Sequence, residues 1–298
     1  MYQTPELSSW KAWVIAMRPK TLPAAVAPVL VGTSLAVRDE VFSPLPALAA
    51  ILGSLLIQIG ANLANDYLDY VNNVDIPGRL GPKRVAQSGL ISLPRLRIAT
   101  AGTFALAALV GAYLTYVAGW PILVIGLASL LSALAYTGGP FPIGYHGLGD
   151  LFVFLFFGLA GVCGTYYVQA LSINATVLVT AIPVGALTVA ILVVNNLRDI
   201  KTDRETGKRT LAVMLGAKAT RVEYLLLLVL AYAVPVLFWF VGWSAAWGLL
   251  PWLSLPLAVR LVRIIFGTAE GPALNKALAG TASLDLVFCI LFAAGLLL

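Results

Sequence analysis

Charged residues, histidine and cysteine are all scarce in this sequence, and each shortage excludes a class of protein. Only 11% of the 298 residues are charged and 60% are hydrophobic, whereas about a quarter of the residues in a soluble domain are charged. This composition excludes soluble domains and a disordered chain. The two cysteines, Cys163 and Cys289, lie in apolar stretches and are too few for a disulfide scaffold. The composition therefore predicts an integral membrane protein.

Nine apolar stretches are each long enough to cross a bilayer. A run of about 17–21 apolar residues spans a hydrocarbon core about 30 Å thick at 1.5 Å per residue. We expect one all-helical membrane domain over residues 1–298, with nine transmembrane helices bundled around a central cavity. The two segments 21–136 and 151–265 would form similar halves, followed by a last helix. The expected spans are residues 21–37, 46–64, 98–117, 120–136, 151–170, 175–195, 223–241, 244–265 and 277–298.

The basic residues predict the orientation of these spans. Of the 19 lysines and arginines, all but Arg38 fall on the side of the N-terminus. Because cytoplasmic loops of membrane proteins are enriched in such residues, we expect a cytoplasmic N-terminus and an external C-terminus. The protein would be multi-pass in the inner (plasma) membrane, with its active site facing the cytoplasm and lipid around it. The basic residues form no continuous face, so we expect no nucleic-acid partner.

Two clusters of acidic and amide side chains follow the second and sixth spans. Steps of three and four residues place members of each cluster on one helical face, if the helices continue that far. The first cluster comprises Asn62, Asn65, Asp66, Asp69, Asn73 and Asp75. The second comprises Asn195, Asn196, Arg198, Asp199, Asp203 and Glu205.

The position of these carboxylates indicates a cation. The C-terminus of a helix carries negative partial charge, so clustered carboxylates are disfavoured there. A cation shared by the two clusters would explain both. With a single histidine in the chain, the ligands would be oxygens, which favours Mg²⁺ held together with substrate phosphates. The alternative is a set of solvated acids paired with nearby lysines and arginines.

A glycine and a basic pair follow each cluster. The pairs are Lys83-Arg84 after Gly81 and Lys208-Arg209 after Gly207. Lysine and arginine donors suit the oxygens of a diphosphate that carboxylate-bound metal does not reach. The side chains expected to contact the diphosphate are Asn62, Asn65, Lys83, Arg84, Arg198, Lys208, Arg209 and Lys20.

Several segments together resemble a known family. These segments are Asn65-Asp66-Tyr67-Leu68-Asp69, Asp199-Ile200-Lys201-Thr202-Asp203, Arg18-Pro19-Lys20-Thr21 and Tyr136-Thr137-Gly138-Gly139-Pro140. They resemble the UbiA-type intramembrane prenyltransferases, and within them the branch that acts on 1,4-dihydroxy-2-naphthoate in menaquinone biosynthesis. The resemblance implies Mg²⁺-dependent transfer of a polyprenyl group from an allylic diphosphate to that aromatic acceptor. Loss of CO₂ and diphosphate would give demethylmenaquinone.

The resemblance also implies roles for individual residues. The four aspartates Asp66, Asp69, Asp199 and Asp203 would be catalytic, and with Asp75 they would hold the metal. The loop 136–150 would cover the acceptor through Tyr136, Tyr145 and His146. The family's Asn, Asp and Asp at four-residue spacing correspond here to Asn65, Asp69 and Asn73, so either Asp66 or Asp75 could be the direct ligand.

Two alternatives share these features. Another UbiA-type enzyme would use the same metal site for a different acceptor, such as 4-hydroxybenzoate, homogentisate or chlorophyllide. A secondary transporter would also have many spans and two similar halves. Transport sites, however, lie near the bilayer midplane, whereas these acids collect at one surface.

Overall fold

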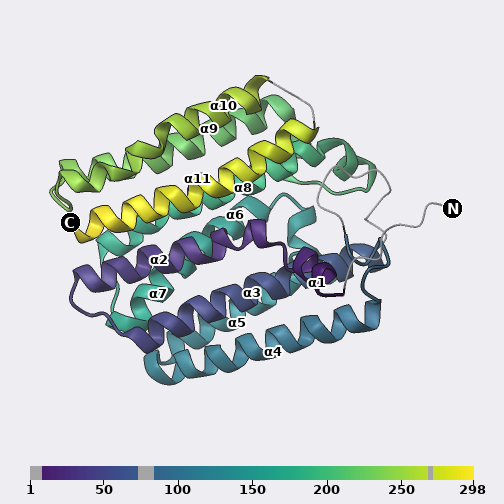
Figure 1. The fold of residues 1–298 in the computed structure, drawn as a ribbon, viewed down its shortest axis with the longest axis horizontal. Coiled ribbons are helices and arrows are strands. Elements are labelled where there is room, and N and C mark those ends of the chain that lie inside the picture. The colour runs from purple at the N-terminus through teal and green to yellow at the C-terminus, as the bar shows by residue number, and fades with distance from the viewer. Residues whose placement is uncertain (1–8, 73–83, 268–270) are drawn as a thin grey trace.

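The computed structural model describes residues 9–72, 84–267 and 271–298, and in these ranges every regular element is a helix. Long helices run up and down side by side, so the molecule is an antiparallel bundle (Figure 1). The elements are α1 (Ser9–Met17), η1 (Pro19–Thr21), α2 (Pro23–Arg38), α3 (Pro44–Val71), α4 (Leu93–Ala118), α5 (Trp120–Ala135), η2 (Ile143–Tyr145), α6 (Gly149–Val153), the π-helical η3 (Phe154–Ala160), α7 (Gly161–Ala170), α8 (Ala175–Glu205), α9 (Leu211–Phe240), η4 (Ala246–Ser254), α10 (Leu255–Gly267) and α11 (Gly271–Leu297).

Helices occur at all nine predicted apolar stretches, and the all-helical membrane class is confirmed. Seven described helices are long and apolar enough to cross a membrane. An eighth span results if Trp10–Thr21 and Pro23–Arg38, which meet at 50°, count as one broken helix. The fourth predicted span, α5, has only 16 residues. The count of nine and the orientation of the termini therefore stay predictions.

Several helices extend beyond their predicted apolar cores, α3, α8 and α9 among them. The helices α3 and α8 continue to Val71 and Glu205, so both aspartate clusters are helical as far as the structure describes them. The apolar span predicted from residue 223 belongs to α9, which begins earlier, at Leu211, where the Thr210 hydroxyl accepts a hydrogen bond from the Val213 N–H. Gly216 has non-helical backbone angles (φ 80°, ψ 165°), so a kink divides α9 into a short first segment and the long helix that follows.

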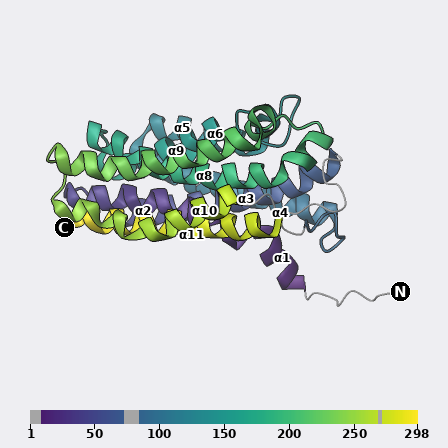
Figure 2. The same cartoon turned by 90° about the horizontal axis from the view of Figure 1, so that it is seen from above.

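The two sides of the bundle are packed differently. The central helix α8 is buried along most of its length and packs against α2, η3, α9 and α11. By contrast, α4 and α5 form one edge of the bundle, away from α9 and α10 (Figures 1 and 2), and only Ile122 of α5 is buried. Both cysteines are buried within helices and form no disulfide. The bundle is therefore only one helix thick at its α4–α5 edge.

The chain directions bring the two aspartate clusters to the same end of the bundle. The helices α3 and α8 end where α9 and α11 begin, and α1 lies at this end too (Figure 1). We call it the aspartate end. The opposite end carries the connection from α2 to α3 and the C-terminus.

Candidate functional site

Two aspartates near the end of α3 bind different kinds of group: Asp66 binds backbone and Asp69 binds side chains. The carboxylate of Asp66 accepts the backbone N–H groups of Val85 and Ala86, each at 3.1 Å. The carboxylate of Asp69 accepts a hydrogen bond from the Tyr145 hydroxyl at 2.6 Å. It also forms an ion pair with the Arg84 guanidinium. Asp66 thus fixes the backbone that presents Arg84, and Asp69 binds the charged side chain.

A second cation reaches Asp69 from the other half of the chain. The Lys208 ammonium lies 3.4 Å from the Asp69 carboxylate and 4.5 Å from the centre of the Tyr145 ring. A carboxylate at the end of α3 meets the negative end of the helix dipole, and the two cations offset that repulsion. The motif after α8 therefore completes the environment of the aspartate on α3.

The end of α8 is organised mostly by its own residues. The guanidinium of Arg198 donates two hydrogen bonds to the adjacent Asp199 carboxylate, at 2.8 and 2.5 Å. It also donates to the side-chain oxygens of Asn195 and Asn275, both at 2.9 Å. One turn further, Asp203 is buried as well. This arrangement holds a planar guanidinium rigidly beside a carboxylate.

Tyr136 is close enough to both clusters to be affected by their charges. Its phenol interacts electrostatically with the carboxylates of Asp150, Asp203 and Asp69. The contact between Lys208 and Asp69 brings the basic pair that follows α8 to the aspartate cluster of α3. We call the side chains of Asp69, Arg84, Tyr145, Lys208 and Tyr136 the polar region.

The expected diphosphate-binding residues take several positions. Asn62 donates to the Met17 carbonyl and the Thr21 hydroxyl, both at 3.0 Å, and so ties α3 to the N-terminal segment. The Asn65 side-chain oxygen accepts the Thr137 hydroxyl at 2.6 Å. The side chains of Lys20 and Arg209 are exposed at the surface. Two further predicted residues, Asp75 and Lys83, lie outside the described residues.

The three expected acceptor-binding residues are also separated. Tyr136 and Tyr145 belong to the polar region, as described above. His146 is exposed, stacks on Phe141 with ring centres 3.7 Å apart, and has Nδ1 2.8 Å from the Pro142 carbonyl. The structure therefore places His146 on the surface of the 136–150 loop rather than among the buried carboxylates.

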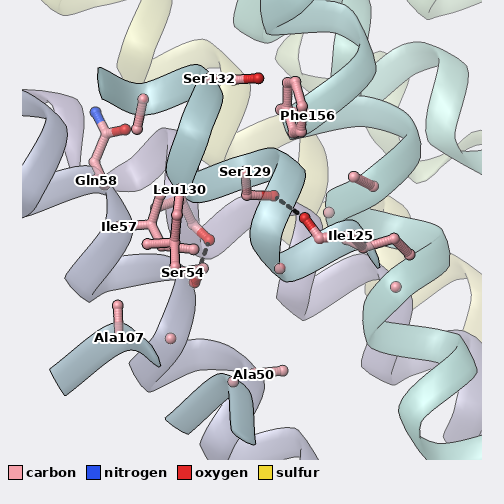
Figure 3. Close-up of a pocket in the computed structure, with 18 of the residues that line it drawn as sticks. Ala50, Ser54, Ile57, Gln58, Ala107, Ile125, Ser129, Leu130, Ser132 and Phe156 are labelled. Atoms are coloured by element: carbon pink, nitrogen blue, oxygen red, sulfur yellow. Dashed lines mark hydrogen bonds between the residues drawn. The ribbon is translucent and has the colours of Figure 1, made fainter. Parts of the chain in front are cut away.

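An apolar cavity begins beside the polar region. It has a volume of about 420 Å³ and lies between α2, α3, α4, α5, η3 and α7. Asn62, Asn65 and Tyr136 line its polar end, and the wall continues to Ala50 near the opposite end of the bundle. Small residues, aliphatic side chains, phenylalanines and a few polar groups make up the wall, among them Ser54, Gln58 and Phe156 (Figure 3). From Asn65 to Ala50 the helix rises by about 22 Å at 1.5 Å per residue.

The carboxylate oxygens near the polar end of the cavity are the type of ligand that a hard divalent cation prefers. Buried carboxylates are the preferred ligands of Mg²⁺, which retains waters or substrate phosphates in the rest of its shell. Within the described ranges no three Asp, Glu, His or Cys side chains already converge on one point. The carboxylates instead contact Arg84, Arg198 and Lys208. Since an ionised carboxylate has about four lone-pair sites, Asp69, with partners in Tyr145, Arg84 and Lys208, can also accept a metal.

Sequence reasoning did not identify several contributors to this site. Thr137 belongs to the motif that begins at Tyr136, but its contact with Asn65 depends on the conformation of the 136–150 loop. Asn275 lies far along the chain at the start of α11 and contacts Arg198, and no local pattern marks it. The Val85 and Ala86 donors are backbone groups, which have no sequence signature.

Comparison with known proteins gives consistent results. A model of the UbiA prenyltransferase family matches residues 25–297. The chain is 38% identical to the 1,4-dihydroxy-2-naphthoate octaprenyltransferase of Escherichia coli, over 98% of this chain and 97% of the relative. It is 37% identical to the enzyme of that name from Mycobacterium tuberculosis, over 97% and 98%. Human UbiA prenyltransferase domain-containing protein 1 is 31% identical over 97% of this chain and 86% of its own length.

Solved structures share the fold. A UbiA homologue from Archaeoglobus fulgidus bound to GPP and Mg²⁺ has a TM-score of 0.68 at 12% identity, with 94% of this chain and 99% of that chain covered. A homologue from Aeropyrum pernix has a TM-score of 0.66 at 18% identity, with 93% and 95% covered. The family model matches nearly the whole bundle, and relatives more than 30% identical cover it from end to end. The chain belongs to the UbiA prenyltransferase family.

Proposed function

We propose that this protein is an aromatic prenyltransferase that joins a polyprenyl group to 1,4-dihydroxy-2-naphthoate. The observation that carries the proposal is the position of Asp69. Its carboxylate contacts Arg84, Lys208 and Tyr145 and lies one helical turn beyond Asn65, which lines the apolar cavity. An anionic head group and a long apolar tail would thus have adjoining sites. The names of the bacterial relatives, which are naphthoate octaprenyltransferases, support the choice of acceptor.

The basic side chains would bind the diphosphate. Arg84 and Arg198 are buried and Lys208 is half-buried, so their charges are screened less than those of exposed residues. Planar guanidinium groups match phosphate oxygens in pairs, and the ammonium supplies a compact charge. As the allylic C–O bond breaks, the diphosphate leaves with the bonding electrons, and these cations stabilise its developing charge.

The aspartates would divide into two roles. Asp69, Asp199 and Asp203 would hold Mg²⁺, which when bound supplies further positive charge to the diphosphate. Both Asp66 oxygens already accept backbone N–H groups, so we assign Asp66 mainly to positioning the Arg84 segment. Asp75 keeps its proposed place among the metal ligands.

The acceptor would bind between the two tyrosines. Tyr136 lines the polar end of the cavity and Tyr145 reaches Asp69, so an aromatic ring placed there lies close to the start of the tail. The ring carbon that bears the carboxylate attacks the allylic carbon. Release of CO₂ then returns its bonding electron pair to the ring, which becomes aromatic again as the hydroquinone, demethylmenaquinol. Loss of two electrons and two protons to a separate oxidant converts this product to demethylmenaquinone. The exposed position of His146 gives it at most a contact at the rim.

The membrane position follows from the substrates. A prenyl tail gains about 0.8 kcal/mol per CH₂-sized unit on leaving water, so the tail stays in the hydrocarbon while the head group reaches the surface. We propose nine spans in the inner membrane with the aspartate end in the cytoplasm, since 18 of the 19 basic residues are expected on that side.

A product assay tests the proposal. Purified protein in detergent is supplied with Mg²⁺, a polyprenyl diphosphate and 1,4-dihydroxy-2-naphthoate, and mass spectrometry detects the prenylated ring. EDTA is the control, and 4-hydroxybenzoate, homogentisate and chlorophyllide are rival acceptors. We expect an EDTA-sensitive, decarboxylated naphthoate product. Product with a rival acceptor alone would refute the naphthoate assignment, and folded protein without product would favour a transporter.

A further inference from the structure

The helical glycines of this bundle fall into two groups that have opposite surroundings. In the first group the glycine allows close packing: a Cβ added to Gly32 would lie 2.6 Å from the Val162 carbonyl oxygen. In the second group a Cβ would meet no atom of the surrounding described residues within 4 Å, as at Gly111, Gly126 and Gly164. Packing does not require glycine at these three positions.

The three open glycines all line the apolar cavity. Gly164 is itself buried, so the empty space beside it is inside the protein and not in the surrounding lipid. Gly111 and Gly126 are partly buried and come from α4 and α5, whereas Gly164 comes from α7. These three helices contact one another. The absence of side chains at all three positions therefore keeps one interior passage wide.

The three glycines lie at a similar depth. Gly111 is seven residues before the end of α4 at Ala118, and Gly126 is six residues after the start of α5 at Trp120. Gly164 is six residues before the end of α7. At 1.5 Å per residue, each lies about 9–11 Å from the end of its helix opposite the aspartates. Gly126 is ten residues from Tyr136, so this level lies about 15 Å below the polar end.

We propose that Gly111, Gly126 and Gly164 form a passage that sets the length of isoprenoid tail the protein accepts. This inference rests on the proposed function. A five-carbon isoprene unit has four main-chain bonds of about 1.5 Å and extends the tail by roughly 5 Å. The first three units would end near the glycine level, and a longer tail passes it only because no side chain stands there. Side chains at these positions would leave room for a short tail and block a long one.

Leucine substitutions test the passage. Gly164→Leu and Gly126→Leu place an apolar side chain in the cavity, and leucine favours the helix more than glycine does. Gly102→Leu is the matched control, because Gly102 is also open to a Cβ and lies on α4, but it is exposed and does not line the cavity. Rates with geranyl and octaprenyl diphosphate are measured for each variant. We expect the octaprenyl-to-geranyl ratio to fall at least tenfold in the two cavity variants and to change less than twofold in the control.

Two outcomes would overturn the inference. An unchanged ratio in both cavity variants would show that the tail does not pass the glycines. An equal loss with both donors would also contradict it, because the geranyl tail ends above that level. Binding of the two diphosphates, measured with Mg²⁺ by thermal shift, separates this from failure of the proposed function. A wild-type protein that binds both donors but prenylates no acceptor would refute the proposed reaction, and the binding ratio would still decide the passage.

Discussion

The same three side-chain types meet at both ends of this molecule. At the aspartate end, Asp69 contacts Arg84 and accepts the Tyr145 hydroxyl at 2.6 Å. At the opposite end, between α2 and α3, Asp39 accepts Arg38 Nε at 2.9 Å and the Tyr166 hydroxyl at 2.7 Å. Hydrogen-bond geometry alone therefore does not distinguish the candidate site from the other cluster.

The surroundings of the two clusters differ. The Asp69 side chain is 4% exposed and that of Asp39 is 23% exposed. Asp69 also has a second cation, Lys208, and its cluster adjoins the cavity, whereas Arg38 is simply the chain neighbour of Asp39. Burial, an excess of positive charge and an adjoining apolar cavity are what make one aspartate cluster suitable for an anionic substrate.

The largest expected effect separates the two aspartates directly. Asp69→Ala removes a proposed metal ligand and the partner of two cations, so we expect kcat/KM to fall by about 10³-fold or more. Asp39→Ala should leave kcat/KM within twofold of wild type. Prenyl transfer by detergent-purified protein is measured, with size-exclusion profiles as a check of folding. Comparable losses in both variants would mean that the Asp69 cluster is merely structural.

The second effect concerns the added cation. Lys208→Met keeps a long apolar side chain and removes the charge. Since a hydrogen bond to a charged group contributes about 1.5–3 kcal/mol, we expect kcat/KM to fall roughly 10- to 100-fold. Lys201→Met is the control, because Lys201 is exposed on the same helix as Asp199. If the two variants had equal activity, Lys208 would have no place in diphosphate binding.

A third test separates the neighbouring aspartates of α3. Asp66→Asn loses a charge that accepts two backbone N–H groups, so the free energy of unfolding should drop by about 1–3 kcal/mol. The Mg²⁺ concentration for half-maximal activity should stay unchanged. In Asp69→Asn we expect that concentration to rise, with a smaller loss of Tm. The reverse pattern would make Asp66 the metal ligand and Asp69 the structural one.

The smallest effects come from the two tyrosines. Tyr145→Phe should lower kcat/KM about 3- to 10-fold, through one lost hydrogen bond. Tyr166→Phe should leave activity unchanged and cost less than about 1 kcal/mol of stability. An activity loss in Tyr166→Phe that matched that of Tyr145→Phe would remove the functional contrast between the two ends.

The stability effect of Tyr166→Phe should depend on pH. Burial raises the pKa of Asp39, but the hydrogen bond from Tyr166 and the charge of Arg38 outweigh it and hold that pKa below the ordinary 3.8. A lowered pKa stabilises the fold above pH 3.8, and this stabilisation is lost as the pH falls through the folded-state value. The difference in Tm between wild type and Tyr166→Phe should therefore be present at pH 6 and disappear in acid. A difference that grew in acid would contradict this assignment.

Much of the architecture could be predicted because hydropathy and charge report directly on a membrane environment. Every predicted apolar stretch is helical, and Asp69 and Asp199 lie on the helices α3 and α8, as their spacing predicts. Helix ends were less predictable, since α9 begins with a short segment, residues 211–215, that a kink at Gly216 separates from the long helix. The relation between the two halves of the chain stays a prediction.

The individual hydrogen bonds and ion pairs of the site could not be predicted. The roles of Asp66 and Asn62 are set by backbone and hydroxyl groups elsewhere in the chain, which leave no pattern in a sequence. Three-dimensional folding also decides that Lys208 reaches Asp69 across 139 positions of the chain. Residue types and spacing identify which groups are available, while loop conformation decides which of them meet.

The short helix α5 has a consequence for the surrounding lipid. Its 16 residues rise by about 24 Å, against a hydrocarbon thickness of about 30 Å, and Val124, Leu127 and Leu131 are exposed along it. Such hydrophobic mismatch is relieved by local thinning of the bilayer or by reorientation of the helix. Because α5 is also a wall of the cavity, acyl-chain length in the host membrane would, in the proposed nine-span arrangement, alter the space proposed to hold the tail.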